Sequence, residues 1–572
     1  MIPQSAVDIV HICAQKGVKR VILSPGSRCA PLTIAFARHQ DISTFTVSDE
    51  RSAAFIGHGM ALKSNEPTAL VCTSGSAAYN YAPTIAEAYF QQVPLIVFTA
   101  DRPPEWINQH DGQTIYQPEI YGRHVKKSFT MPVDTSHDDA LWHVHRIMNE
   151  AINLSKASPP GPVHVNVPFR EPFYPEENEV IKASEQLRVT NELNGHPELA
   201  ESDWWDIFKQ WNNAKRILIL GGQGDQDFGL DGILKEIGWS MKVPVLGDII
   251  SNLHAIDNSI KHQDLFLIGK TEDVKKDLAP DLLITFGKSI ISKNIKLLLR
   301  KYKAKAHWHL QPYGEVADTY QSLTHIYRTS PQVFFTKIKN YFQDTGSSEA
   351  QNTFREQWQE NEIKSTQVLK SFIEKSDFSD LSAYYHAMNS LPNNCDLHLA
   401  NSMAVRYANF VGVNPAQTGI HVYANRGTSG IDGSNSTATG AAMISDRLTY
   451  LLTGDLAFFY DRNAFWHNYL PKNLRIIVFN NHAGGIFSLI DGPSRQPELA
   501  AYFETEQRLS CASTASEFGF EYTHCADFAS LEEAFKTFHE ISEQPKLIEI
   551  STDNAINTEV FKSLKAFMAD NS

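Results

Sequence analysis

Two polar residues in the last third of the chain have the types and spacing of a metal site. The apolar run 450–453 ends in Gly454-Asp455, and a second run, 474–480, is followed by Asn481. A helical stretch separates the runs, so we expect both residues at the carboxyl ends of parallel strands, where open α/β sheets bind ligands. A carboxylate oxygen, an amide oxygen and a nearby carbonyl suit a hard cation such as Mg²⁺, with diphosphate oxygens filling further positions.

The same residues could instead be simple turn residues, because Gly, Asp and Asn commonly follow strands. The Gly484-Gly485 pair favours a ligand site, since glycine lets the backbone come close to a ligand. The spacing alone leaves both interpretations open.

Short apolar runs along the chain predict three successive parallel-sheet α/β domains. Continuous runs rich in Val, Ile and Leu alternate with longer helical patterns, which is typical of parallel sheets covered on both faces. The runs lie at 18–26, 69–74, 94–100 and 163–167, then at 216–220, 243–246, 282–286 and 307–310, and finally at 396–400, 420–424, 450–453, 474–480 and 547–550. The predicted divisions are an N-terminal domain at 1–180, a linker at 181–205, a central domain at 206–345, a linker and helix at 346–380, and a C-terminal domain at 381–572.

The composition is that of an ordinary globular protein. Of the 572 residues, 42% are hydrophobic and 20% are charged, which excludes disorder as the main interpretation. There are 51 Lys and Arg against 65 Asp and Glu, a net charge of -14, and this disfavours nucleic acid or anionic lipid as the principal partner. The sequence contains no apolar run long enough for a membrane span.

The cysteines and the N-terminus favour a cytoplasmic enzyme. None of the six cysteines forms a C-x-x-C pair, so we do not expect a thiolate zinc site. Scattered cysteines in a chain of this length are typical of reduced thiols. The first residues lack the basic start and long apolar segment of a signal peptide.

Five blocks of sequence resemble one branch of the thiamin diphosphate-dependent enzymes. They are SPGSRCAPLT (24–33), SDERSAAF (48–55), CTSGSAA (72–78), TADRPPE (99–105) and NRGTSGIDG (425–433). With the Gly454-Asp455-Leu456 segment, they make the chain similar to the 2-succinyl-5-enolpyruvyl-6-hydroxy-3-cyclohexene-1-carboxylate (SEPHCHC) synthases of menaquinone biosynthesis. Leu456 replaces a Gly common in other thiamin diphosphate enzymes, and this variant occurs in the SEPHCHC branch. The resemblance covers nearly the whole chain and is weakest in the central domain and the linkers.

The resemblance implies how thiamin diphosphate and its metal would be held. Glu50 matches the residue that hydrogen-bonds N1′ of the aminopyrimidine and so activates the cofactor. Ile431 matches the bulky residue that keeps the cofactor folded in a V. Asp455 and Asn481 would bind Mg²⁺ or Mn²⁺ through side-chain oxygens, and Ala483 through its carbonyl. Further cofactor-contacting positions are Ser402, Met403, Leu456, Ile486 and Phe487.

The resemblance also implies a pocket for two dianions, 2-oxoglutarate and isochorismate. Arg suits carboxylates because its guanidinium can bind both oxygens. The matching positions come from all three predicted domains: Ser27, Arg28, Arg102, Gln113, Lys293, Ser402, Arg406 and Arg426. Gly112 stands where the family has Asn, so that amide contact is missing here or is supplied by Asn108. His482 is interpreted as a residue of the pocket rim.

The implied reaction is a carboligation of the transferase class. 2-Oxoglutarate loses CO2 on thiamin diphosphate, and the resulting succinyl-semialdehyde carbanion equivalent adds in conjugate fashion to isochorismate, which gives SEPHCHC. In the family, the pyrimidine-binding N-terminal domain of one subunit and the diphosphate-binding C-terminal domain of another enclose the cofactor. The resemblance therefore implies a homodimer as the minimum active unit, and a tetramer is compatible with it.

Other functions were weighed against this one. Another thiamin diphosphate-dependent decarboxylase or carboligase would share Glu50 and the metal ligands but does not predict the blocks at 24–33, 99–105 and 425–433 together. A nucleotide-dependent oxidoreductase would use the glycines at 222–224, but Asp227 would then face a pyrophosphate. A catalytically inert paralogue should have lost the activating Glu or the metal ligands. Taken singly, Glu50 would be an ordinary first-turn helix residue and Ile431 a core residue.

Overall fold

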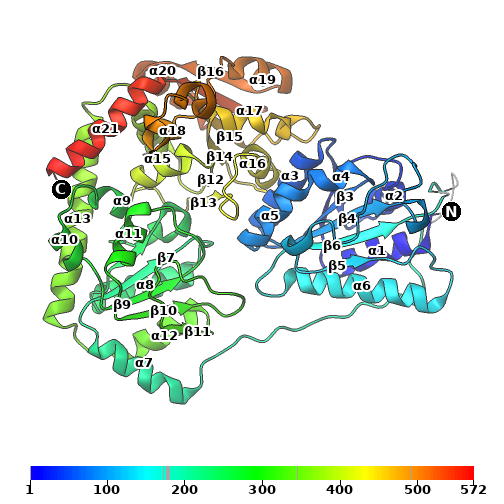
Figure 1. The fold of residues 1–572 in the computed structure, drawn as a ribbon, viewed down its shortest axis with the longest axis horizontal. Coiled ribbons are helices and arrows are strands. Elements are labelled where there is room, and N and C mark those ends of the chain that lie inside the picture. Colours follow the sequence, from blue (N-terminus) through cyan, green and yellow to red (C-terminus); the bar gives the residue numbers. More distant parts are fainter. Residues whose placement is uncertain (1, 172, 176–180, 344, 491, 572) are drawn as a thin grey trace.

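The computed structural model describes residues 2–571 except 172, 176–180, 344 and 491. Its strands form three sheets of six, five and six strands, and every strand pair is parallel. Figure 1 shows each sheet in a separate α/β lobe, with the N-terminal lobe joined to the central lobe by a long extended segment. The predicted fold class is confirmed.

The N-terminal sheet has the strand order β2-β1-β3-β4-β6-β5. Its strands are β1 (Arg20–Leu23), β2 (Ser43–Thr46), β3 (Thr68–Cys72), β4 (Leu95–Asp101), β5 (Ser128–Thr130) and β6 (Val163–Pro168). One face is covered by α1 (Gln4–Gln15), α2 (Ala30–Ala37) and α6 (Asp138–Lys156). The other is covered by α3 (Glu50–Ser64), α4 (Ser76–Asn80) and α5 (Ala82–Gln91). Strands β3 and β4 are continuous hydrophobic runs in the sequence, because they are buried on both faces of the sheet.

The central sheet has the order β11-β10-β9-β7-β8. Its strands are β7 (Ile217–Gly221), β8 (Val245–Gly247), β9 (Leu282–Phe286), β10 (Ala306–Leu310) and β11 (His325–Tyr327). One face is covered by α7 (Glu201–Asn213), α8 (Phe228–Ser240) and α12 (Pro331–Phe342). The other packs on α9 (Gln263–Phe266), α11 (Lys293–Lys301) and α13 (Glu349–Ile373), with α10 (Glu272–Asp277) nearby. Helix α7 begins inside the segment predicted as the linker 181–205.

The C-terminal sheet has the order β13-β12-β14-β15-β17-β16. Its strands are β12 (Asp396–Leu399), β13 (His421–Ala424), β14 (Thr449–Gly454), β15 (Leu474–Asn480), β16 (Glu521–Cys525) and β17 (Lys546–Ser551). One face is covered by α14 (Asp380–Ser390), α15 (Met403–Val411), α20 (Phe528–Phe538) and α21 (Asn554–Asn571). The other is covered by α16 (Ser434–Ala442), α17 (Asp455–Tyr460) and α19 (Cys511–Phe518), and the short α18 (Ile486–Leu489) follows β15.

Helices α3 and α16 join the N-terminal and C-terminal lobes. A Cβ atom on Gly59 would lie 2.0 Å from the carbonyl oxygen of Thr437, and one on Gly440 would lie 2.0 Å from that of Ile56. Both positions therefore require glycine, because a side chain at either one would prevent the two backbones from coming this close. On the opposite side of the molecule, α13 runs beside α21 and ties the central lobe to the C-terminal one (Figure 1).

All six cysteines are free and buried. Within the described part of the chain, none of the helices combines the length and the apolar character needed to cross a membrane.

Candidate active site

A cavity of about 190 Å³ lies at the carboxyl ends of the C-terminal strands. Strands β14 and β15 are parallel neighbours, with Gly454 paired to Phe479, so the residues that follow them emerge at one edge of the sheet. The cavity is also lined by the first residues of α15, α17 and α18. Nine predicted cofactor and metal residues line it together: Ser402, Met403, Ile431, Asp455, Leu456, Asn481, Ala483, Ile486 and Phe487.

The Asp455 carboxylate is held in place from two sides. Its Oδ1 accepts from the N–H of Leu456 at 2.8 Å, and its Oδ2 accepts from Nε2 of Gln507 at 2.7 Å. The side chain is buried, and this burial raises the pKa of Asp455 to about 6. The hydrogen bond from Gln507 acts in the opposite direction and lowers the pKa. Gln507 has no motif around it, and the sequence did not indicate its role.

The Asn481 amide is also fixed by its neighbours. Its Nδ2 donates to Oδ2 of Asp380 at 3.0 Å, and its Oδ1 accepts from the N–H of Ala483 at 3.0 Å. Asp380 is itself buried in the cavity wall, and its Oδ1 accepts from Oγ1 of Thr552 at 2.6 Å. The left-handed backbone in this segment falls on His482, at a φ of 60°, and not on Ala483. An alanine therefore fits the position whose carbonyl is predicted to bind the metal.

The composition of the cavity wall fits a divalent cation with a bound diphosphate. No Lys or Arg belongs to the wall among the described residues, yet two buried carboxylates, Asp380 and Asp455, do. Two carboxylates without a cation are unfavourable in a buried site, and a hard divalent ion would offset them. A Cβ on Gly485 would lie 2.9 Å from Oδ1 of Asn554, a buried oxygen with no hydrogen-bond partner. The space between Gly485 and Asn554 is compatible with a polar ligand. Among the described residues, no three His, Cys, Asp or Glu side chains form a cluster suited to a metal, so the predicted site depends on amide, carbonyl and cofactor oxygens.

Glu50 lies outside this cavity in the single chain. It is the first residue of α3, where Asp49 caps the helix by accepting from the N–H of Ser52 at 3.2 Å. The half-buried Glu50 carboxylate accepts from Nδ2 of Asn80 at 3.2 Å. Among the described residues of one chain, Glu50 therefore does not meet the cavity.

The predicted substrate residues of the N-terminal lobe lie near one another. The Arg28 guanidinium is buried, donates to the carbonyl of Phe169 at 3.1 Å and stacks over the Phe173 ring at 4.5 Å. Arg102 forms an ion pair with Asp111 at 2.7 Å and donates to the carbonyl of Gly112 at 3.1 Å.

The two remaining positions of this group are exposed, Ser27 beside Arg28 and Gln113 beside Gly112. Asn108, the suggested substitute for the missing amide, donates instead to the hydroxyl of Tyr116.

The predicted substrate residues of the C-terminal lobe form a second group. Arg406 donates to the carbonyl of Ser402 at 2.5 Å, and Arg426 donates to Oδ1 of Asn401 at 2.8 Å. Burial lowers the pKa of Arg426, and the neighbouring Arg406 guanidinium lowers it further. Two adjacent guanidiniums of like charge are able to bind a carboxylate.

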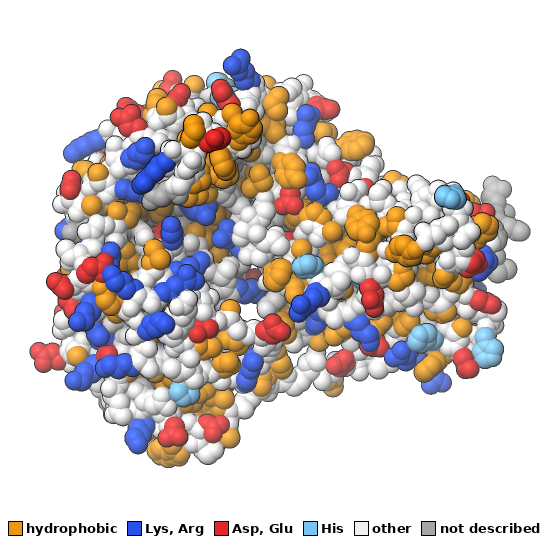
Figure 2. Space-filling view, viewed as in Figure 1, with side chains coloured by type: hydrophobic (Ala, Val, Ile, Leu, Met, Phe, Trp, Pro, Cys, Tyr) orange, Lys and Arg blue, Asp and Glu red, His pale blue; other side chains and the backbone are white. Residues whose placement is uncertain are grey.

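The central lobe brings Lys296 towards this group, and the predicted Lys293 lies on the same helix. Lys293 is exposed in the first turn of α11. Lys296 lies one turn further along and interacts electrostatically with Arg426, which together with burial lowers the pKa of Lys296. Figure 2 shows Lys and Arg side chains along the hollow between the central and C-terminal lobes.

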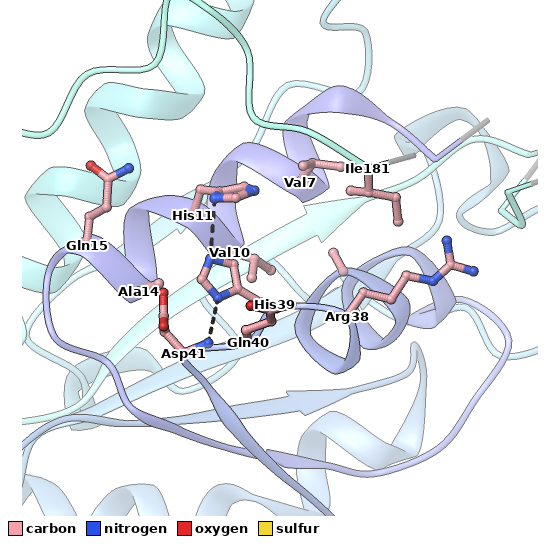
Figure 3. A pocket seen from close by; sticks show the side chains of 11 residues that line it. Val7, Val10, His11, Ala14, Gln15, Arg38, His39, Gln40, Asp41 and Ile181 are labelled. Carbon is pink, nitrogen blue, oxygen red and sulfur yellow. Dashed lines mark hydrogen bonds between the residues drawn. The ribbon is translucent and has the colours of Figure 1, made fainter. Parts of the chain in front are cut away.

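A larger cavity, of about 430 Å³, lies between α1 and α2 and contains none of the predicted site residues (Figure 3). His39 Nδ1 accepts from the N–H of Asp41 at 3.3 Å, so His39 Nε2 carries the hydrogen and donates to His11 Nδ1, also at 3.3 Å. The two rings bind each other and do not present a pair of metal ligands.

Two family descriptions and several curated relatives match the chain. Residues 5–120 match the family described as "Thiamine pyrophosphate enzyme, N-terminal TPP binding domain", and residues 185–399 match "Middle domain of thiamine pyrophosphate". The chain is 46% identical over 563 residues to the 2-succinyl-5-enolpyruvyl-6-hydroxy-3-cyclohexene-1-carboxylate synthase of Cytophaga hutchinsonii, which covers 98% of each chain. It is 38% identical to the enzyme of the same name from Flavobacterium johnsoniae over 97% of each chain, and 35% identical to that from Bacteroides fragilis over 98%.

Proposed function

The chain belongs to the SEPHCHC synthase family of thiamin diphosphate-dependent enzymes, and from this premise we propose that it joins 2-oxoglutarate to isochorismate, with loss of CO2, to form SEPHCHC. The observation that carries the proposal is the meeting of nine family-matched residues in one cavity. The product belongs to menaquinone biosynthesis.

The cavity in the C-terminal lobe is proposed to hold the diphosphate end of the cofactor. Asp455 and Asn481 would bind Mg²⁺ or Mn²⁺ through their side-chain oxygens, and Ala483 through its carbonyl. The N–H groups in the first turn of α15 favour an anion beside them. When bound, thiamin diphosphate supplies the carbanion chemistry that releases CO2 and forms the new carbon–carbon bond.

We propose a homodimer in which Glu50 completes the cavity of the other subunit. Two features support this arrangement. The described wall of the cavity belongs to the C-terminal lobe alone. In addition, aromatic side chains are exposed on both lobes, including Tyr79 and Phe90 on α4 and α5, and Tyr460 and Trp466 in the C-terminal lobe. Figure 2 shows hydrophobic side chains gathered where the two lobes meet, and such surfaces commonly mark protein interfaces.

The two groups of basic residues are proposed to bind the substrate carboxylates. Arg406, Arg426 and Lys296 would come from one chain, and Arg28 and Arg102 from the chain that supplies Glu50. Two dianions need several cations, and a guanidinium can bind both oxygens of a carboxylate. Locally gathered cations let a chain with a net charge of -14 bind anionic substrates.

Mass spectrometry of the reaction tests the proposed function. The protein is incubated with thiamin diphosphate, Mg²⁺, 2-oxoglutarate and isochorismate, and we expect a species equal to the two substrates minus CO2. The species should disappear when any one component is omitted.

The Glu50→Gln variant is the matched control, because it should bind the cofactor in calorimetry but lose turnover. Release of CO2 without an adduct would show a decarboxylase or a different acceptor. No turnover by the wild-type protein with its cofactor bound would show an inert paralogue.

A further inference from the structure

Helix α5 of the N-terminal lobe is hydrogen-bonded to the loop of the C-terminal lobe that carries Arg426. Glu87 and Gln91 are four residues apart on α5 and therefore lie on one face of the helix. Gln91 Nε2 donates to the carbonyl of Ala424 at 3.1 Å, before Arg426. Glu87 binds the loop just after Arg426, so the two side chains hold it on both sides.

Among the described residues, the Glu87 side chain hydrogen-bonds to this loop alone. Its Oε1 accepts from the N–H of Gly427 at 2.6 Å, and its Oε2 accepts from the N–H of Thr428 at 2.6 Å and from the Thr428 hydroxyl at 2.7 Å. The side chain is only 1% exposed. Charge-assisted bonds of this length are among the stronger ones, and burial protects them from competition by water.

The loop has no room to move against α5. A Cβ on Gly427 would lie 2.4 Å from the carbonyl oxygen of Glu87 and 3.0 Å from the N–H nitrogen of Gln91. The loop backbone therefore packs directly on the helix backbone. Any shift of α5 must move Arg426, because the residues on both sides of it are bonded to that helix.

The far end of Arg426 is fixed by a second set of bonds. Its Nη1 donates to Oδ1 of Asn401, and Asn401 Nδ2 donates to the carbonyls of Asn425 and Gly430, each at 2.7 Å. The guanidinium lies close to Arg406, and Glu87 is one of the carboxylates whose charge offsets this repulsion. Without Glu87, the loop would lose its anchor and the two arginines would lose a compensating charge.

We propose that Glu87 is a positioning residue: it fixes the 425–430 loop so that Arg426 presents its guanidinium to a carboxylate of the substrate. The inference rests on the proposed function, because Arg426 is a substrate residue only there. Glu87 acts through Arg426 and does not itself touch the substrate. Through this contact, a residue of the N-terminal lobe fixes the position of a residue of the C-terminal lobe.

Steady-state kinetics of Glu87→Gln in the full-length protein, loaded with thiamin diphosphate and Mg²⁺, tests the proposal. We expect KM to rise about tenfold for the substrate whose KM also rises in Arg426→Gln, with a smaller change in kcat, because a charge-assisted contact is lost. Thr428→Val should give a smaller rise, and Thr428→Ser should restore the wild-type value. Glu119→Gln removes an exposed carboxylate of the same lobe and should change nothing.

A double-mutant cycle separates positioning from general loosening of the fold. If Glu87 acts through Arg426, Glu87→Gln should change kcat/KM less than about twofold in an Arg426→Gln background. An equal loss in both backgrounds, or an unchanged KM in Glu87→Gln and Thr428→Val, would overturn the proposal.

Hydrogen exchange measured without substrate keeps this test separate from the proposed function. The amides of Gly427 and Thr428 should exchange about tenfold faster in Glu87→Gln, while those of α16 should not change. If the wild-type protein makes no SEPHCHC, the proposed function fails, and the same comparison is made with the Kd for 2-oxoglutarate. A wild-type exchange rate in Glu87→Gln would then overturn the positioning role by itself.

Discussion

Each side chain that we propose as a metal ligand has a partner that fixes its orientation. Gln507 holds Asp455, and Asp380 holds Asn481. Both partners lie far from their target in the sequence and belong to no motif. Residue types and spacing predict the proposed ligands, because these residues follow strands in recognisable motifs. The partners could not be predicted in this way, because only the folded chain brings them to the site.

The Asp380→Asn variant should weaken the metal-dependent binding of thiamin diphosphate. The change removes a negative charge from the cavity wall and leaves one acceptor oxygen where the carboxylate offered two, to Asn481 and to Thr552. Such changes typically cost about 10- to 100-fold in metal affinity. Titration calorimetry of Mg²⁺ into protein with excess cofactor measures this. Thr552→Ser keeps the other hydrogen bond to Asp380 and should bind Mg²⁺ like the wild type. Equal Mg²⁺ affinity in Asp380→Asn would show that Asn481 needs no such partner.

At the scale of elements, a buried pair joins the central lobe, α13 and the end of α15. His262 Nδ1 contacts Oε1 of Glu362 at 2.6 Å, and its Nε2 donates to the carbonyl of Val411 at 3.1 Å. Burial alone would lower the pKa of His262, but the Glu362 carboxylate outweighs it, and the net shift is upward. Burial alone would raise the pKa of Glu362, but His262 outweighs this effect, and the net shift is downward. The charged pair therefore stabilises the junction.

This pair predicts a pH dependence of stability with a definite sign. The imidazolium contributes fully below its unfolded pKa of 6.5, and its contribution is lost as the pH rises through the raised folded pKa. The carboxylate contributes fully above 4.5 and is lost only as the pH falls below that value. The difference in melting temperature between wild type and Glu362→Gln should therefore be larger at pH 6 than at pH 9.

Calorimetric melting at the two pH values measures this difference, which at pH 6 corresponds to about 3 kcal/mol for a broken buried pair. Glu360→Gln, an exposed change on the same helix, serves as the control. A difference that does not vary with pH would show that the pair is uncharged.

Four strands that do not form an apolar run in the sequence share one property. These are β2, β5, β11 and β16, and each lies at an edge of its sheet. Their segments include STFT and EYTHC, with mostly exposed or half-buried side chains. The interior strands are buried on both faces and so read as apolar runs. An edge strand forms because its backbone hydrogen-bonds to the neighbouring strand. The hydrophobic pattern of the sequence does not predict that pairing.

At the scale of the whole molecule, we propose that the N-terminal lobe contributes residues to two active sites. Its α3 carries Glu50, which we propose for the partner subunit's cavity, while α5 holds Arg426 of its own chain. Sequence resemblance could predict both sets of residues. The resemblance also implies a cofactor held between two subunits, which divides these residues between two sites of one dimer. It does not indicate that α5 holds Arg426 of its own chain. The structure of the single chain supports that division, because its cavity lacks Glu50.

Mixed dimers test this division directly. A Glu50→Gln subunit keeps its cavity, and an Asp455→Asn subunit keeps its Glu50, so a dimer of the two has one intact site and one with both defects. Each variant alone should be inactive. Random mixing in a symmetric dimer makes half of the dimers mixed, each with one working site, so co-expression should restore about one quarter of the wild-type activity. A site built within a single chain would leave one defect in every site, and co-expression would then restore no activity.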